Sequence, residues 1–127
     1  MHKNLLLALV CFYTLAIGVL SLISLSEYKT VKVVGADKIV HMGFHFIFSI
    51  MWYWYFLKSN FLSTRRQMKI RVVTMSLFYG ILIEALQHLL TDTRQADVWD
   101  LAANIVGSVL AIAVLTALEK ILSSRKI

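Results

Sequence analysis

The stretch Val98–Leu118, VWDLAANIVGSVLAIAVLTAL, contains a single charged residue, Asp100. A transmembrane helix needs about 20 predominantly apolar residues, because each residue adds about 1.5 Å and the hydrocarbon core is about 30 Å thick. This stretch therefore predicts a membrane-spanning helix.

Three further apolar stretches of similar length precede it, at Asn4–Ser24, Lys38–Leu57 and Arg71–Leu90. Only 16% of the 127 residues are charged, against roughly 25% in soluble domains, so a soluble fold could not hide all four stretches. We expect one all-α domain over residues 1–127, a polytopic membrane protein built as a four-transmembrane-helix bundle. A cleaved signal peptide is an alternative for the first stretch, but the apolar run exceeds the 7–15 residues of a signal core.

The distribution of lysine and arginine predicts the orientation of the helices. Most of these residues lie on one side of the predicted bundle, together with both termini: Lys3, Lys58, Arg65, Arg66, Lys69, Arg71, Lys120, Arg125 and Lys126. The positive-inside rule then places both termini in the cytoplasm and the acidic loops outside. The run Trp52–Tyr55 is expected to form an aromatic belt at the cytoplasmic interface. The basic residues behind the net charge of +6 would then face the anionic lipid of the inner leaflet, so the charge does not imply a nucleic-acid partner.

Polar residues gather near the other end of the helices, on three stripes with helical spacing. The stripes comprise Lys38, His41 and His45; Gly80, Glu84, Gln87 and His88; and Asp97, Asp100, Asn104 and Gly107. Short loops make consecutive helices neighbours, so the three stripes can face inward together. Polar groups inside a membrane are costly, and these stripes are therefore the best indication of function.

The depth of three polar residues in their helices also suggests that they lie close together. His45, Glu84 and Asn104 each lie about six residues inside the predicted outer end of a helix, roughly 9 Å deep. We therefore expect these three side chains to meet in one pocket. The first helix offers only small hydroxyl side chains, and we expect it to be a lipid-facing support.

The polar residues could also have purely structural roles in place of functional ones. Glu84 could form an ion pair with Arg94 or Lys38, since an ionised carboxylate in hydrocarbon must be paired or protonated. Asp97 or Asp100 could simply cap the fourth helix.

The two histidines of the second helix also have purely structural explanations. His41 could lie at the headgroup level, and His45 could fill a packing gap. Asn104 lies too deep to be a cap and is expected to bond across helices.

Three motifs resemble those of the VanZ-like membrane proteins. They are Asp37–His41 (DKIVH) at the start of a helix, Glu84–Gln87 (EALQ) at the end of another, and Arg94–Asp100 (RQADVWD), which continues to Asn104 and Gly107. The resemblance covers the last three helices and little of the first.

The resemblance implies a multi-pass protein of the bacterial cytoplasmic membrane that serves the cell envelope. Members of the family are associated with low-level resistance to glycopeptides such as teicoplanin, but the resemblance implies no settled activity. His45 and His88 fall outside the family pattern, and Met42 and Gly43 stand where many members have an aromatic residue.

The first functional hypothesis is an enzyme acting on a lipid or lipid-linked envelope intermediate at the outer leaflet. Glu84, His41 and Asp100 would carry proton transfer, because a half-buried carboxyl can have its pKa raised toward neutrality. The expected substrate-binding residues are Asp37, Lys38, Gln87, Arg94, Asp97 and Asn104, with Arg94 and Lys38 holding an anionic headgroup.

Three alternatives stay open. The protein could bind or transport the amphiphile without chemistry, with homo-oligomerisation making transport more feasible. It could be a scaffold, although interhelical hydrogen bonds in membranes contribute only about 0.6 kcal/mol each. It could bind a metal through His41, His45, Glu84, His88, Asp97 or Asp100, but no compact metal motif is present, and Lys38 and Arg94 would oppose a cation. We therefore expect neither a metal nor another cofactor.

Overall fold

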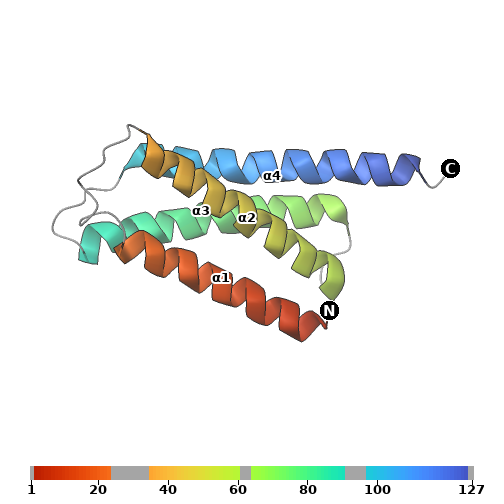
Figure 1. Cartoon of the computed structure of the whole chain (residues 1–127), viewed down its shortest axis with the longest axis horizontal. Helices are drawn as coiled ribbons and strands as arrows, with labels where there is room; N and C mark the ends of the chain where they lie inside the picture. The colour runs from red at the N-terminus through yellow and green to blue at the C-terminus, as the bar shows by residue number, and fades with distance from the viewer. Residues whose placement is uncertain (1, 24–34, 61–63, 91–96, 126–127) are drawn as a thin grey trace.

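The computed structural model describes residues 2–23, 35–60, 64–90 and 97–125, and these residues form four α-helices (Figure 1). The helices are α1 (Lys3–Ile23), α2 (Ala36–Ser59), α3 (Arg65–Leu90) and α4 (Val98–Ser124). The prediction of an all-helical chain with four helices is confirmed.

Three of the four helices, α1, α3 and α4, are long and apolar enough to cross a membrane. Their outward-facing side chains include large exposed apolar groups such as Phe12 and Phe78. A water-soluble monomer rarely exposes apolar surface on this scale, so these three helices fit a membrane protein. Helix α2 has a suitable length of 24 residues, but its histidine, tyrosine and tryptophan side chains lower its hydropathy, and it does not qualify on composition.

Three helices are longer than the predicted spans, and α2 (Ala36–Ser59) extends the predicted Lys38–Leu57 by two residues at each end. Helix α3 begins at Arg65 rather than Arg71, and α4 ends at Ser124 rather than Leu118. Hydropathy marks the part of a helix that fits in lipid, whereas the helix itself continues as long as its backbone hydrogen bonds and caps allow. At the start of α3, Thr64 and Gln67 form a reciprocal capping box, each accepting a hydrogen bond of 3.2 Å from the backbone N–H of the other.

The helices run up and down in alternation, so α2 and α4 start at the same end of the bundle (Figure 1). Helix α2 packs most extensively against α4, while α1 packs against α2 and α3 on the opposite side from α4. The first residues of α1 and the last of α4 lie at the end where α2 finishes and α3 begins. The starts of α2 and α4 and the end of α3 therefore share the other end.

Glycine allows the close approach of α2 and α4. A Cβ atom added at Gly107 would lie 2.2 Å from the backbone carbonyl oxygen of Met42, far inside van der Waals contact. Only a residue without a side chain fits there, as is common where helices pack closely in lipid. This contact brings the polar stripes of α2 and α4 together.

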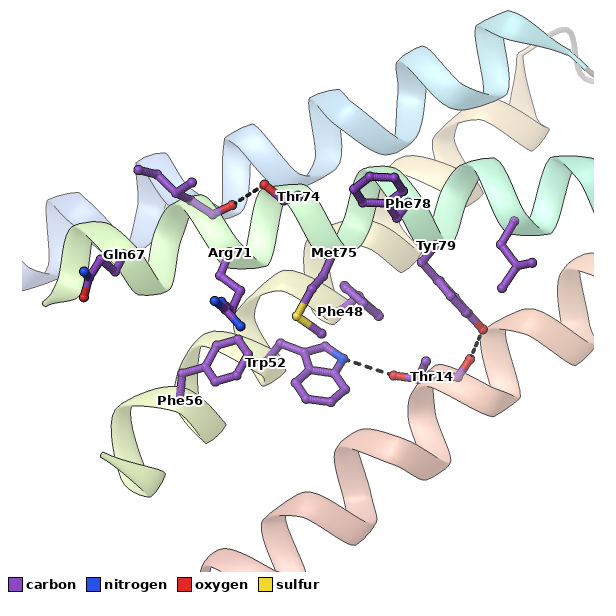
Figure 2. A pocket seen from close by; sticks show the side chains of 12 residues that line it. Thr14, Phe48, Trp52, Phe56, Gln67, Arg71, Thr74, Met75, Phe78 and Tyr79 are labelled. Atoms are coloured by element: carbon purple, nitrogen blue, oxygen red, sulfur yellow. Dashed lines mark hydrogen bonds between the residues drawn. The ribbon is translucent and has the colours of Figure 1, made fainter. Parts of the chain in front are cut away.

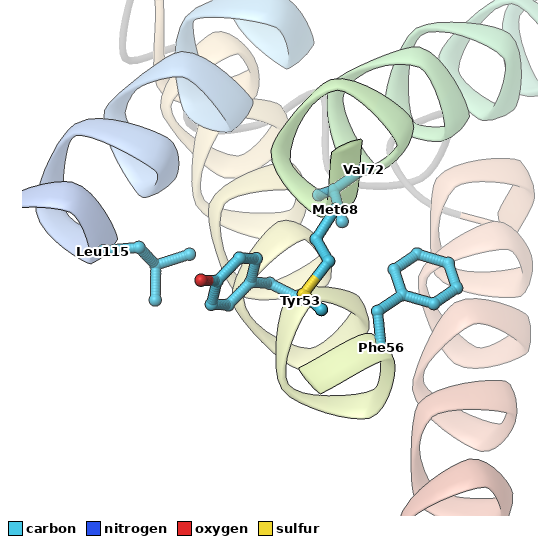
Figure 3. Close-up of a cluster of buried hydrophobic side chains, with 5 residues drawn as sticks. All are labelled: Tyr53, Phe56, Met68, Val72 and Leu115. Atoms are coloured by element: carbon cyan, nitrogen blue, oxygen red, sulfur yellow. The ribbon is translucent and has the colours of Figure 1, made fainter. Parts of the chain in front are cut away.

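A second core lies at the end of the bundle where α2 finishes. Tyr53, Phe56, Met68, Val72 and Leu115 form a buried apolar cluster there (Figure 3). Tyr53 is therefore part of the core. The prediction that Trp52–Tyr55 form an aromatic belt at the membrane interface is wrong for Tyr53. Successive residues of a helix point about 100° apart, so four consecutive aromatic side chains cannot all face the membrane interface.

Candidate functional site

Lys38, in the first turn of α2, joins the starts of α2 and α4. Its Nζ donates hydrogen bonds to Asp37 Oδ2 at 3.0 Å, Asp97 Oδ2 at 2.8 Å and Asp100 Oδ1 at 2.7 Å. A lysine ammonium group has three donor hydrogens, and these three carboxylates account for them all. Lys38 thus neutralises acidic side chains of the protein, and its expected role in holding a substrate headgroup stays a prediction.

Asp97 is the N-cap of α4. Its Oδ1 accepts a hydrogen bond of 2.8 Å from the backbone N–H of Trp99, which satisfies one of the free donors at the helix start. Its own backbone N–H donates to Glu84 Oε2 at 3.0 Å, which links the end of α3 to the start of α4. The capping alternative thus holds for Asp97, whereas Asp100 lies in the first turn and is buried.

His41, Glu84 and Asp100 lie together, although they come from three different helices. Their side chains are only 5%, 7% and 3% exposed, and one nitrogen or oxygen atom of each lies within 4.8 Å of the others. His41 Nε2 is 3.7 Å from Asp100 Oδ2, and His41 Nδ1 is 3.3 Å from Asn104 Oδ1. The structure therefore brings together the three residues that the sequence proposed for proton transfer. Asn104 makes the interhelical bond expected of it.

We call Asp37, Lys38, His41, Glu84, Asp97, Asp100 and Asn104 the polar cluster. It contains four carboxylates and one ammonium group, a formal excess of three negative charges when His41 is neutral. Two of the carboxylates, Glu84 and Asp100, are buried. At a separation below 4.8 Å and an effective dielectric constant near 20, two such charges repel by roughly 3 kcal/mol or more. Two ionised carboxylates this close therefore require a compensating proton or cation.

Asp37 lies at the exposed rim of the polar cluster. Partial burial acts to raise the pKa of this carboxyl, but the hydrogen bond and positive charge of Lys38 outweigh it and lower the pKa below its ordinary value. Asp37 therefore stays ionised at neutral pH.

Gln87 and His88, two other predicted members of the α3 stripe, contribute differently. Gln87 is buried, and its Nε2 donates to the backbone carbonyl of Ser21 at 2.7 Å, so it ties α3 to α1. His88 is exposed. Arg94, expected to bind a headgroup or pair with Glu84, lies outside the described residues.

His45 belongs to a separate layer, and the expectation that it meets Asn104 is wrong. Its Nδ1 lies 2.6 Å from Ser76 Oγ, and Ser76 in turn shares a hydrogen bond with Ser108 of α4. Helices α2 and α4 start side by side at Ala36 and Val98, so Asn104 is level with His41 rather than with a residue one turn deeper. The predicted start of α2 at Lys38 placed His45 too near the outer end.

A second polar group, missed in the sequence, lies at the opposite end of the bundle. Glu119 accepts hydrogen bonds from Tyr53 and, at 2.7 Å, from Lys69 Nζ, and lies 3.3 Å from Arg65 Nη1. Lys69 also donates to Thr116 Oγ1 at 2.9 Å. Glu119 follows the predicted end of the fourth span, so the hydropathy pattern placed it outside the bundle. Its spacing of three residues from Thr116 could have placed both on one face of a longer helix.

A cavity of about 890 Å³ lies between α1, α2 and α3, apart from the polar cluster (Figure 2). Its lining is mostly aromatic and aliphatic, with a few polar side chains: Thr14, Phe48, Trp52, Phe56, Gln67, Ile70, Arg71, Thr74, Met75, Phe78, Tyr79 and Leu82. Figure 2 shows Tyr79 reaching from α3 to Thr14 of α1, where its hydroxyl donates to the backbone carbonyl. Tyr79 also stacks on Phe48, with ring centroids 5.5 Å apart, and contacts the ring of His45. None of the residues that line the cavity belongs to the polar cluster.

The arrangement can exchange a proton or hold a cation. Because Asn104 Oδ1 is an acceptor, His41 donates through Nδ1, and the lone pair on Nε2 faces Asp100. Buried carboxylates and an imidazole with a free lone pair are the groups used in general acid–base catalysis and in metal binding. No protein-family model, curated protein or solved structure matches the chain.

Proposed function

We propose that the protein is a multi-pass protein of the bacterial cytoplasmic membrane whose polar cluster, at the outer end, binds or acts on a lipid or lipid-linked envelope intermediate. In this proposal α2 crosses the membrane beside the three apolar helices, and both termini lie in the cytoplasm. Two observations support the orientation: the ends of α1 and α4 lie at the same end of the bundle, and the basic residues Arg65, Arg66 and Lys69 lie there as well.

The observation that carries the proposal is the burial of His41, Glu84 and Asp100 side by side. Bringing ionisable groups from three helices into a low-dielectric interior is costly, and neutral residues would pack the helices at lower cost. The serine layer beneath, in which His45 bonds to Ser76, holds helices with fewer charges. A purely structural role therefore does not account for the buried acidic residues of the polar cluster.

We propose Glu84 as the general acid or base, with His41 sharing the proton. Glu84 is buried, and one of its carboxylate oxygens lies within 4.8 Å of a ring nitrogen of His41, so a proton can pass between these two groups. Asp100 is fixed by Lys38 and can orient and charge-stabilise the His41 imidazole. The headgroup must be held by other groups, because the donors of Lys38 are used within the protein; Arg94 remains the candidate from the sequence.

An envelope lipid as the ligand is supported by the motifs that resemble VanZ-like proteins and by the apolar cavity. A contribution to teicoplanin-type resistance is part of the same proposal. The cavity favours a second candidate function, binding or transport of the amphiphile without chemistry, because about 890 Å³ of mostly apolar space can hold a hydrocarbon chain.

The test is a comparison of lipid-linked envelope intermediates in a bacterial strain lacking the protein and in strains expressing Glu84→Gln or Glu119→Gln. The two variants make the same chemical change at opposite ends of the bundle, so Glu119→Gln is the matched control. A species that accumulates in the deletion strain and with Glu84→Gln, but not with Glu119→Gln, supports catalysis. An unchanged inventory with altered distribution across the membrane supports binding or transport. A Glu84→Gln protein that inserts normally and restores full function would rule out the proton-transfer role.

A further inference from the structure

We infer that His41, Glu84 and Asp100 bind a divalent transition-metal ion of the Zn²⁺ class. The inference concerns the same polar cluster as the proposed function but gives Glu84 another role, that of a metal ligand instead of a proton donor, and it does not depend on the identity of the amphiphile. The three side chains reach the same point from α2, α3 and α4, and all are more than nine-tenths buried.

The donor atoms fit such an ion in kind and in spacing. An imidazole nitrogen with two carboxylate oxygens is a common ligand set for zinc and neighbouring metals. His41 Nε2 and Asp100 Oδ2 lie 3.7 Å apart, too far for a hydrogen bond. Two ligands on a tetrahedral zinc, with bonds of about 2.0–2.1 Å, are separated by about 3.4 Å. A small contraction would therefore place both atoms on one ion, and the ligand atom of Glu84 lies within the same 4.8 Å set.

Each ligand is oriented by a further contact, as is usual at metal sites. His41 donates through Nδ1 to Asn104 Oδ1, which directs the lone pair of Nε2 toward Asp100. Asp100 uses Oδ1 for Lys38 at 2.7 Å and presents Oδ2 to His41. Glu84 Oε2 accepts from the backbone N–H of Asp97, so its carboxylate is also held in place.

Charge also favours the ion. Two lone pairs, on His41 Nε2 and on the Asp100 carboxylate, face each other when the imidazole is neutral, and a cation between them turns repulsion into attraction. Lys38 appeared from the sequence to oppose a metal. In the structure its Nζ is bonded to Asp37, Asp97 and Oδ1 of Asp100, so that Oδ2 of Asp100 is left facing His41.

Three protein ligands leave a coordination position open, which is typical of catalytic rather than structural zinc. In that case Glu84 serves as a ligand, and a metal-bound water would supply the reactive group. Stoichiometric metal binding therefore distinguishes this role from one in which Glu84 transfers the proton without an ion.

The experiment measures metal content in the purified full-length chain, without substrate. The protein carries a non-histidine affinity tag and Cys11→Ser, because that exposed thiol could take up metal. It is stripped with a chelator, loaded with Zn²⁺, separated from excess ion and analysed for zinc, with helicity checked by circular dichroism. We expect about one Zn²⁺ per chain. A folded protein holding less than about a tenth of an equivalent would overturn the inference and leave the proposed function in place.

Variants locate the ion. His41→Phe, Glu84→Gln and Asp100→Asn should each abolish stoichiometric binding. Asn104→Ala should weaken binding by about 10–100-fold, as removal of a ligand-orienting group does. The exposed histidine in His88→Phe serves as the matched control and should leave binding unchanged. Full zinc retention in a folded Glu84→Gln or Asp100→Asn protein would contradict the site.

Discussion

Gly107→Ala should destabilise the protein, because this glycine sets the distance between α2 and α4. The added Cβ would lie 2.2 Å from the carbonyl oxygen of Met42, whereas ordinary contact begins at 3.4 Å. The atom in the way belongs to the backbone and cannot rotate aside, so the helices must separate by about 1.2 Å at this point. The bond between His41 and Asn104, already long at 3.3 Å, would not survive a separation of this size.

Gly43→Ala provides the matched control, since nothing lies within 4 Å of a Cβ added at Gly43. Alanine has a higher helix propensity than glycine, which stabilises both variants by about 0.5–1 kcal/mol. This contribution cancels when the two variants are compared. The remainder for Gly107→Ala is an overpacking cost of about 1–3 kcal/mol plus about 1 kcal/mol for the lost hydrogen bond. We therefore expect Gly107→Ala to be about 2–4 kcal/mol less stable than Gly43→Ala. Gly80→Ala should fall between them, because its Cβ would meet the movable amide of Asn104 at 2.8 Å.

The assay is equilibrium unfolding in mild detergent by added dodecyl sulfate, followed by tryptophan fluorescence. Trp52 is a suitable reporter because its Nε1 donates to Thr14 and so joins α1 to α2. A difference between Gly107→Ala and Gly43→Ala below about 0.5 kcal/mol would refute the close backbone contact, and with it the register that aligns His41 with Asn104.

Three further substitutions test the ion pairs. Lys38→Met should cost about 3–5 kcal/mol by leaving buried Asp100 without its counter-charge, and adding Asp100→Asn should recover part of this loss in the same unfolding assay. Acidification should remove the stabilisation by Asp37: its folded pKa is depressed, so its contribution is complete above the unfolded value of 3.8 and is lost as the pH falls through the folded value. Unfolding measured from pH 6 to pH 2 should accordingly be less pH-dependent in Asp37→Asn, and an identical profile would contradict this ion pair. Glu119→Gln should cost about 1–3 kcal/mol, because it weakens the contacts with Arg65 and Lys69. The control Lys120→Gln, at an exposed site on the same helix, should be nearly neutral. Equal stability of the two variants would show that Glu119 does not hold the bundle together.

The apolar stretches determined the helices, because a run of about 20 apolar residues can satisfy its backbone only as a helix once it lies in lipid. Helical spacing also indicated which polar residues share a face, and it placed Asp100 and Asn104 on one stripe of α4 correctly; Asp97 joins them as the N-cap, with an extended backbone. Both results depend on the geometry within one helix, which is fixed at about 3.6 residues per turn whatever the neighbours do.

The contacts between helices were decided only by the tertiary structure. Sliding one helix past another by a single turn moves its side chains by about 5.4 Å, more than a hydrogen bond can tolerate, and no spacing within one helix specifies that register. The register is set by the approach of Gly107 to Met42, which places His41 rather than His45 beside Asn104. It also lets Asp97 and Asp100 take two of the donor hydrogens of Lys38. The sequence thus determined that the acidic, basic and imidazole groups gather at one end of the bundle, and the packing of α2 on α4 decided which of them bond to one another.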